Sequence, residues 1–313
     1  MEKRFQAYDQ KDFITKINLK LKNQSNLILN FQISKSSKIN RFDKLSELDS
    51  TQNLKFAEWY YGPQKRIMAS SILNLSPSNI FDKGRFIVSY QAIGESRHNR
   101  KFGSEILYNQ NERLDVYSIN GDFSKNMYEK LEMLYGFEYT NNLLFSDSNS
   151  AIIDTSNPSV FLSEDQSFSR YPNDKATHSA LAGYFKYLKK INNYSNLNFG
   201  LRLSYNKVNV GWDFNSDEFL NNDLNSTFLN QFESLSLKNL SLTGSFGYVT
   251  RIYENNKVSI NLSSGFRSPN IDDIGKIREN AGILLIPNTT VKPEKAYTID
   301  FGWTNFSDKF NSA

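Results

Sequence analysis

The chain has 313 residues with a formal net charge of +4, and it contains 2 histidines and no cysteine. Without cysteine, disulfide scaffolds, iron–sulfur clusters, thiolate zinc sites and cysteine nucleophiles are excluded. Aromatic residues make up 14% of the chain, which argues against disorder, and the basic residues form no run typical of a nucleic-acid-binding arm. No stretch approaches about 18 consecutive apolar residues, so no transmembrane helix is predicted.

Apolar and polar residues alternate along most of the sequence. Between positions 196 and 205 the odd positions hold Leu, Phe, Leu, Leu and Tyr, and the even positions hold Asn, Asn, Gly, Arg and Ser. A period of two is typical of strands with one apolar and one polar face. The alternation slips near Val116 and Lys238, which indicates either bulges or misplaced strand limits. In chain order we predict about eleven strands: 11–22, 26–36, 64–76, 84–96, 111–123, 129–143, 178–191, 196–208, 236–252, 256–267 and 294–306.

Two features separate this pattern from an ordinary globular sheet. The predicted strands have about ten residues or more, whereas globular strands mostly have about 5–6 and a strand that crosses a bilayer needs about 9–11. Short turns alternate with long polar segments, and this is typical of outer-membrane barrels. The predicted turns are 23–25, 124–128, 192–195 and 253–255, and the long segments are 37–63, 144–177, 209–235 and 268–293.

We therefore predict an all-β fold, an antiparallel transmembrane β-barrel with an apolar face toward lipid and a polar face toward the lumen. Aromatic residues near strand ends, such as Trp303, fit the interfacial girdles of such barrels. Two alternatives stay open: a soluble β-sandwich adhesin or carbohydrate-binding module, and an outer-membrane pore that lacks a plug. An enzyme is not predicted, because a Ser–His–Asp site would have to use His98 or His178 and no GxSxG motif is present.

Three segments carry a family resemblance. Residues 57–66 read AEWYYGPQKR, residues 264–274 read SGFRSPNIDDI and residues 286–294 read IPNTTVKPE. In this order and spacing they resemble boxes in the barrel of TonB-dependent outer-membrane receptors, in the branch for siderophores, haem or cobalamin. The resemblance implies capture of such a nutrient at the surface of a Gram-negative cell and its active transport with energy from TonB. It implies no catalytic residue and no resident cofactor.

The same resemblance bears on domain organisation. Family members have a plug and a barrel of 22 strands, which agrees with the plugged lumen of the largest transporter barrels. With about eleven strands, residues 1–313 are interpreted as one partial, open segment of such a barrel, lacking the plug domain, signal peptide and closing strands. The implied partners are the TonB complex, reached through the missing plug, outer-membrane lipid and a small metal chelate, with no nucleic acid.

Candidate ligand-binding residues lie in the boxes and in one basic segment. Trp59, Tyr60 and Tyr61 are expected either to stack on a planar ligand or to anchor the loop. Arg97 and His98 belong to the basic sequence RHNR, which suits an anionic siderophore or a metal chelate.

The second box adds residues that are expected either to contact ligand or to order their loop. These residues are Arg267, Asn270, Asp272 and Asp273. Residues 271–285 contain no histidine, which weakens a haem assignment, although a tyrosine can ligate iron. No metal site is predicted, and His178, at a predicted strand start, is a weaker ligand candidate.

Overall fold

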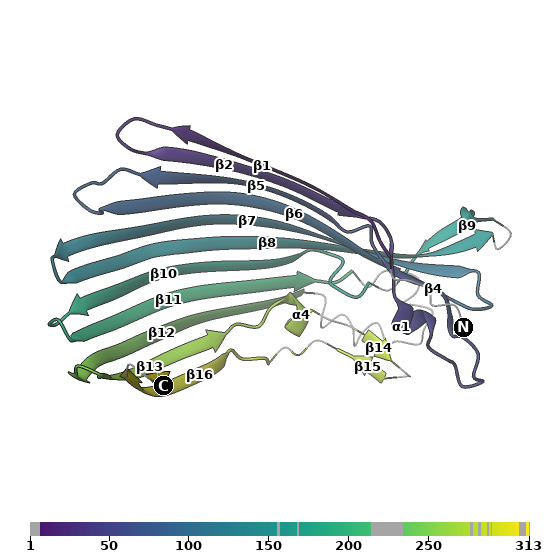
Figure 1. Cartoon of the computed structure of the whole chain (residues 1–313). Coiled ribbons are helices and arrows are strands. Elements are labelled where there is room, and N and C mark those ends of the chain that lie inside the picture. Colours follow the sequence, from purple (N-terminus) through teal and green to yellow (C-terminus); the bar gives the residue numbers. More distant parts are fainter. Residues whose placement is uncertain are drawn as a thin grey trace.

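A computed structural model describes residues 7–154, 157–167, 169–213, 234–275, 278–280, 283–286, 288, 290–306 and 311–312. Within these residues, 15 strands form one antiparallel sheet whose main path runs β1-β2-β5-β6-β7-β8-β10-β11-β12-β13-β16-β17. Neighbours along the path are mostly consecutive in sequence, so the sheet is an up-and-down meander (Figure 1). The sheet is open, with β1 along one edge and β16 along the other.

Eleven long strands build the wall. They are β1 (Gln10–Lys20), β2 (Asn26–Ser36), β5 (Lys65–Leu75), β6 (Lys83–Lys101), β7 (Ile106–Tyr128), β8 (Leu131–Asp154), β10 (Ala176–Lys190), β11 (Ser195–Gly211), β12 (Ser234–Tyr253), β13 (Asn256–Arg267) and β16 (Glu294–Phe306). The eleven strands predicted from the alternation are thereby confirmed.

Shorter elements lie at the loop end of the wall. They are β3 (Ile39–Asn40), α1 (Phe42–Leu45), β4 (Phe56–Tyr61), β9 (Asn157–Gln166), α4 (Ile271–Ile274), β14 (Arg278–Asn280) and β15 (Ile283–Leu285), with β17 (Asn311–Ser312) beside the end of β16. Two of them correct the predicted loops, since β4 pairs with β6 and β9 pairs with β8. Among the described residues, no helix is long and apolar enough to cross a membrane.

Three strands are much longer than a bilayer crossing requires. β6, β7 and β8 have 19, 23 and 24 residues, against about 9–11 for a tilted membrane strand. Their surplus projects at the loop end, where β4 and β9 join them (Figure 1). The turn predicted at 124–128 is wrong, because β7 continues to Tyr128 and the turn is 129–130.

Directly opposite residues point to the same side of a sheet, so the register defines two faces. On the outer face, Phe31 pairs with Ala69, Ala69 with Tyr90 and Tyr90 with Tyr117. On the inner face, one position away, Asn30 pairs with Ser70. The inner row then continues through Ser89 and Ser118, whose hydroxyls lie 2.6 Å apart.

The apolar outer face is not covered by a second sheet. Leu201, Leu203 and Leu240 of this face are 42%, 50% and 67% exposed. In a β-sandwich these side chains would pack against the opposite sheet, and besides the wall the described residues form only the two-stranded β14–β15 sheet. The architecture is that of a partial barrel, so the sandwich alternative is wrong.

The register continues without a shift through both predicted slips. Val116 lies opposite Gln91, and Lys238 lies opposite Lys207. Bulges at these two positions are therefore wrong. The pattern slips near Lys238 because the neighbouring Leu237, on the inner face, packs against a small buried cluster at the loop end.

Candidate ligand site on the inner wall

The second sequence box forms a tight capped turn. β13 ends at Arg267, and Asn270 caps α4 by accepting a hydrogen bond from the Asp273 amide at 3.1 Å. The Asp273 carboxylate in turn accepts from the Asn270 amide at 2.9 Å. This reciprocal arrangement satisfies amide groups that a helix start leaves free. Arg267 reaches both carboxylate oxygens of Asp273 at 2.8 Å and Glu294 at 2.9 Å, which ties α4 to the start of β16.

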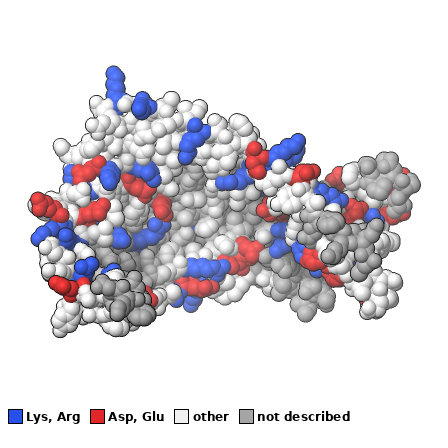
Figure 2. Space-filling view, viewed as in Figure 1, with Lys and Arg blue, Asp and Glu red and all other residues white. Residues whose placement is uncertain are grey.

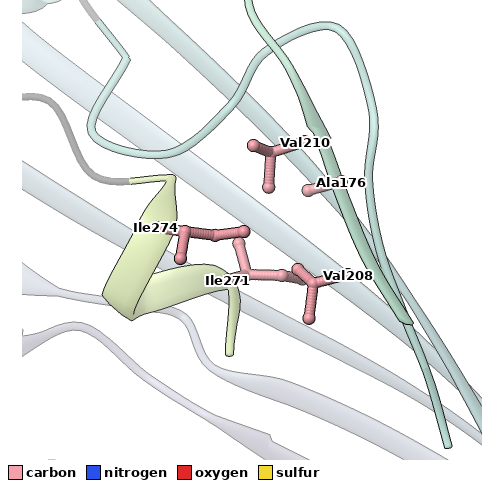
Figure 3. Packing of buried hydrophobic residues seen from close by; sticks show 5 residues of the cluster. All are labelled: Ala176, Val208, Val210, Ile271 and Ile274. Atoms are coloured by element: carbon pink, nitrogen blue, oxygen red, sulfur yellow. The ribbon is translucent and has the colours of Figure 1, made fainter. Parts of the chain in front are cut away.

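The turn places α4 against the inner wall. Ile271 and Ile274 point toward Ala176, Val208 and Val210 (Figure 3), and all five side chains are buried. These wall residues lie on the inner face near the loop ends of β10 and β11. Burying an isoleucine contributes roughly 1.5–3 kcal/mol, so this small cluster holds α4 inside the partial barrel.

Beside α4 lies a cavity of about 370 Å³. Its walls come from β6, β7, β8, β10, α4 and the segment before β10. Apolar lining is supplied by Ile93, Leu114, Leu144 and Ile271, and polar lining by Glu95, Arg97, Glu112, Asn142, Tyr171, His178, Asn270 and Asp272.

The polar groups of the cavity are only partly paired with one another. Arg97 Nη1 lies 3.4 Å from Glu112 Oε1, and the two side chains are 17% and 8% exposed. Tyr171 donates to Asp272 at 2.9 Å, and both burial and this hydrogen bond raise the pKa of Tyr171.

Three buried polar atoms of the same cavity have no hydrogen-bond partner among the described residues. They are Glu112 Oε2, Asn142 Oδ1 and His178 Nε2. Asn142 and His178 lie directly opposite each other on β8 and β10. An unsatisfied buried polar group costs about 1–3 kcal/mol. The cavity therefore offers a carboxylate, an amide and an imidazole to whatever enters it.

The aromatic box, by contrast, is divided between the two faces of β4. Tyr61 lies opposite Arg97, and Trp59 meets Tyr61 edge to face with ring centroids 5.0 Å apart. Tyr60 points the other way and stacks on His98, with centroids 4.5 Å apart. The three rings cannot therefore act as one stacking surface.

Arg41 organises the half of the box that faces inward, and sequence reasoning missed it. Its guanidinium lies 4.8 Å from the Trp59 ring centre and donates to the Tyr61 hydroxyl at 2.6 Å. Arg41 also forms a bidentate ion pair with Asp43, which lowers the pKa of Asp43 to about 2. The cluster is well tied within the protein, which favours loop anchoring for Trp59 and Tyr61.

The predicted candidates are thus distributed over three places. Arg97, Asn270 and Asp272 meet in the cavity, although they come from segments far apart in sequence. Arg267 and Asp273 hold the turn beside it. The remaining residues lie at β4 and the projecting end of β6: Trp59, Tyr60, Tyr61 and His98.

Comparison with known proteins identifies the family. A family model described as "TonB dependent receptor-like, beta-barrel" matches residues 6–313. The chain belongs to this family. No curated protein matches the sequence.

Solved structures share the fold at low identity. The copper transporter OprC superposes with a TM-score of 0.67 at 12% identity, over 96% of this chain and 43% of that chain. A double mutant of the Serratia marcescens hemophore receptor HasR, in complex with its hemophore HasA and heme, gives 0.68 at 12%, over 95% and 42%. The FrpB iron transporter from Neisseria meningitidis gives 0.60 at 14%, over 97% and 44%.

These proteins are transporters and receptors rather than enzymes, and their family is one of outer-membrane proteins. The present chain spans 42–44% of their length.

Proposed function

We propose that this chain is part of the barrel wall of an outer-membrane receptor in a Gram-negative cell, which takes up a scarce nutrient with energy from TonB. The family membership, the polar inner face and the apolar outer face support this proposal. Among the described residues the two edges of the wall do not pair with each other, and β16 pairs on its outer side only with the two residues of β17. This open sheet, together with a span of 42–44% of related chains, supports a larger barrel that further strands close around a plug.

The observation that carries the proposal is the cavity beside α4. It combines apolar walls with a few converging polar groups, which is the usual composition of a small-molecule site. The charges are mixed, since Arg97 faces inward among Glu95, Glu112 and Asp272. A siderophore, haem or cobalamin presents both charged or polar groups and apolar surface, so the mixed lining suits a part of such a metal chelate better than a simple anion.

Within the site, the residues take different roles. Arg97 would pair with a ligand carboxylate or another anionic group, competing with Glu112 for its guanidinium. His178 and Asn142 would bind polar ligand atoms, since their buried atoms lack partners among the described residues. Asn270, Asp273 and Arg267 would act indirectly, by holding α4 at the cavity wall.

The test is direct binding to the intact receptor, purified from outer membranes. Ferric siderophores, haem and cobalamin are titrated separately, and binding is followed by quenching of tryptophan fluorescence. One class is expected to bind tightly, and the variant His178→Ala is expected to weaken that binding by about tenfold, the effect of losing one hydrogen bond in a buried site. Lys186→Gln, on the inner-face row of Leu134 and Gly200 away from the cavity, is the matched control and is expected to bind as the wild type does.

A pore remains the alternative in which the inner wall only lines a water-filled channel. In planar bilayers, steady ion conductance by the intact protein, together with no saturable binding of any chelate, would contradict the receptor proposal and favour the pore.

A further inference from the structure

A row of lysines crosses the outer face near the loop end of the first strands. Lys11 on β1 lies directly opposite Lys35 on β2, and Lys35 lies directly opposite Lys65 on β5. All three side chains are exposed. Their place on the outer face follows from the register, because the next row on that side holds Phe13, Ile33 and Ile67.

Repulsion between these lysines destabilises the pairing of the three strands. Like charges directly opposite each other destabilise a strand pair, and neighbouring strands are only about 4.8 Å apart. None of the three lysines forms an ion pair within the part of the chain that the structure describes. Three positive charges therefore lie within roughly 10 Å, two strand spacings, and no described carboxylate pairs with them.

The row lies at the boundary of the apolar band. Phe13, Ile33 and Ile67 below it are all exposed, as expected of side chains that face lipid. Lys35 is the last residue but one of β2, so the row lies at the loop end of the strands, away from the short turns. In this family of barrels the loop end faces the cell exterior, which puts the lysines level with the headgroups of the outer leaflet.

An apolar groove lies on the same face, separated from the lysine row by the row of Phe13, Ile33 and Ile67. It has a volume of about 530 Å³, and its lining comes from β1, β2, β5, β6 and β7. Small side chains, Ala69 and Ser71, form its floor, between Phe31 and Leu29 on one side and Tyr90 and Val88 on the other. An acyl chain fits such a groove, and its headgroup would then meet the lysine row.

The row also contains a gap. Opposite Lys65 the next strand carries Gly94, and a Cβ added there would meet nothing nearer than the Lys65 Cβ at 4.0 Å. Beyond Gly94 the row continues with Arg113, which is paired with Asp115 at 2.9 Å. Space is thus open between two cationic side chains at headgroup level.

From the lysine row and the groove beneath it, we infer that this part of the outer face binds one lipid with several acyl chains and more than one phosphate, the chemistry of lipid A in lipopolysaccharide. A lipid with a single phosphate would leave most of the row unneutralised, since three lysines are spread over two strand spacings. The inference rests on the outer-membrane placement of the barrel and is independent of the nutrient that the receptor takes up.

The test is lipid binding to the intact receptor, purified in detergent and followed by native mass spectrometry. The probes are lipid A with two phosphates, lipid A with one phosphate and phosphatidylglycerol. The lipid with two phosphates is expected to bind most tightly. The triple variant Lys11→Gln, Lys35→Gln, Lys65→Gln is expected to bind it about a hundredfold more weakly, since each lysine near an anionic headgroup contributes roughly a factor of five.

Two further variants separate this site from a general charge effect. Lys16→Gln, Lys20→Gln, Lys186→Gln removes the same charge from the inner face and is expected to leave lipid binding unchanged. Ala69→Leu fills the floor of the groove, keeps the outer face apolar and is expected to weaken binding. Wild-type affinity in the outer-face triple variant or in Ala69→Leu would overturn the inference, and so would equally tight binding of phosphatidylglycerol.

Discussion

Asn270 lines the edge of the cavity, and its main role is to fix the position of α4. Its side chain accepts from the Asp273 amide, so α4 starts at a fixed place beside the cavity. Because α4 has only four residues, it has little helical stability of its own. Its position therefore depends on this cap, on Arg267 and on the two buried isoleucines.

The cap leads to a prediction for Asn270→Ala. Loss of the cap is expected to cost about 1 kcal/mol and to increase hydrogen exchange of the amides in 271–275, which mass spectrometry would detect. Asn270→Ser keeps a capping oxygen and should protect these amides nearly as well as Asn270 does. Equal exchange in the alanine and serine variants would show that the cap does not hold α4.

His98 makes a pH-dependent contact at the projecting end of β6, beyond the bilayer-length part of the strand. It stacks on Tyr60, and burial lowers the pKa of His98 below its usual value. His98 therefore binds a proton more readily when β4 is detached from β6 than when the two strands are paired.

The stability of the β4–β6 pairing is accordingly expected to be complete above about pH 6.5, the usual value for histidine, and to fall as the pH decreases below it. Hydrogen exchange of the β4 amides, measured from pH 7.5 to pH 5 and corrected for intrinsic rates, checks this. The variant His98→Gln should remove most of the pH dependence, whereas an unchanged dependence in that variant would assign it to another group.

At the scale of elements, α4 is a short helix held by a patch of apolar residues on an otherwise polar inner face. Ile274 is 3% exposed and packs on the wall. Ile274→Ala is expected to cost about 2–5 kcal/mol of the docking free energy of α4. Ligand affinity should fall with it, because α4 forms one wall of the cavity.

Ile286→Ala is the matched control, since Ile286 lies in the same loop and is exposed. Binding titrations of the two variants check the prediction. Equal affinities in Ile274→Ala and Ile286→Ala would contradict a role for α4 in the cavity.

The long strands could be predicted because lipid on one side and water on the other impose a strict alternation. β4 and β9 could not, because they pair with the projecting ends of β6 and β8, where the lipid that imposes the alternation is absent. The apparent slip at Lys238 has a related cause: Leu237 is apolar on the inner face because α4 covers it.

The site was predicted only in part for a similar reason. Its box residues could be named from the family resemblance, but Glu112, Asn142 and His178 are brought together by register across three strands. Asn142 and His178 lie on strands that are joined by a long connection containing β9, and the sequence alone does not give the register between those strands. A period of two fixes the face of each residue but not its height along the wall.

At the scale of the whole molecule, the wall has an apolar outer face and two edges, β1 and β16, that lack a partner strand over most of their length within the described residues. Charged side chains gather mainly toward the two ends of the strands in the view of Figure 2, with both signs mixed at each end. Free strand edges are templates for pairing with other chains.

Residues 1–313 expressed alone are therefore expected to aggregate without detergent, whereas the intact receptor, with closed edges, should remain monodisperse in detergent. Size-exclusion chromatography with light scattering distinguishes the two. A monodisperse monomer of residues 1–313 in plain buffer would contradict the outer-face assignment.

The central claim is that this wall belongs to a receptor driven by TonB, and nutrient uptake tests it most directly. The intact receptor is expressed in iron-starved cells with and without a functional TonB protein, and uptake of radiolabelled ferric siderophores and haem, and separately of cobalamin, is measured. We predict saturable uptake of one of these nutrients that requires TonB and is reduced in His178→Ala but not in Lys186→Gln. Uptake that is equal with and without TonB, or that does not saturate, would contradict the claim and indicate a passive pore.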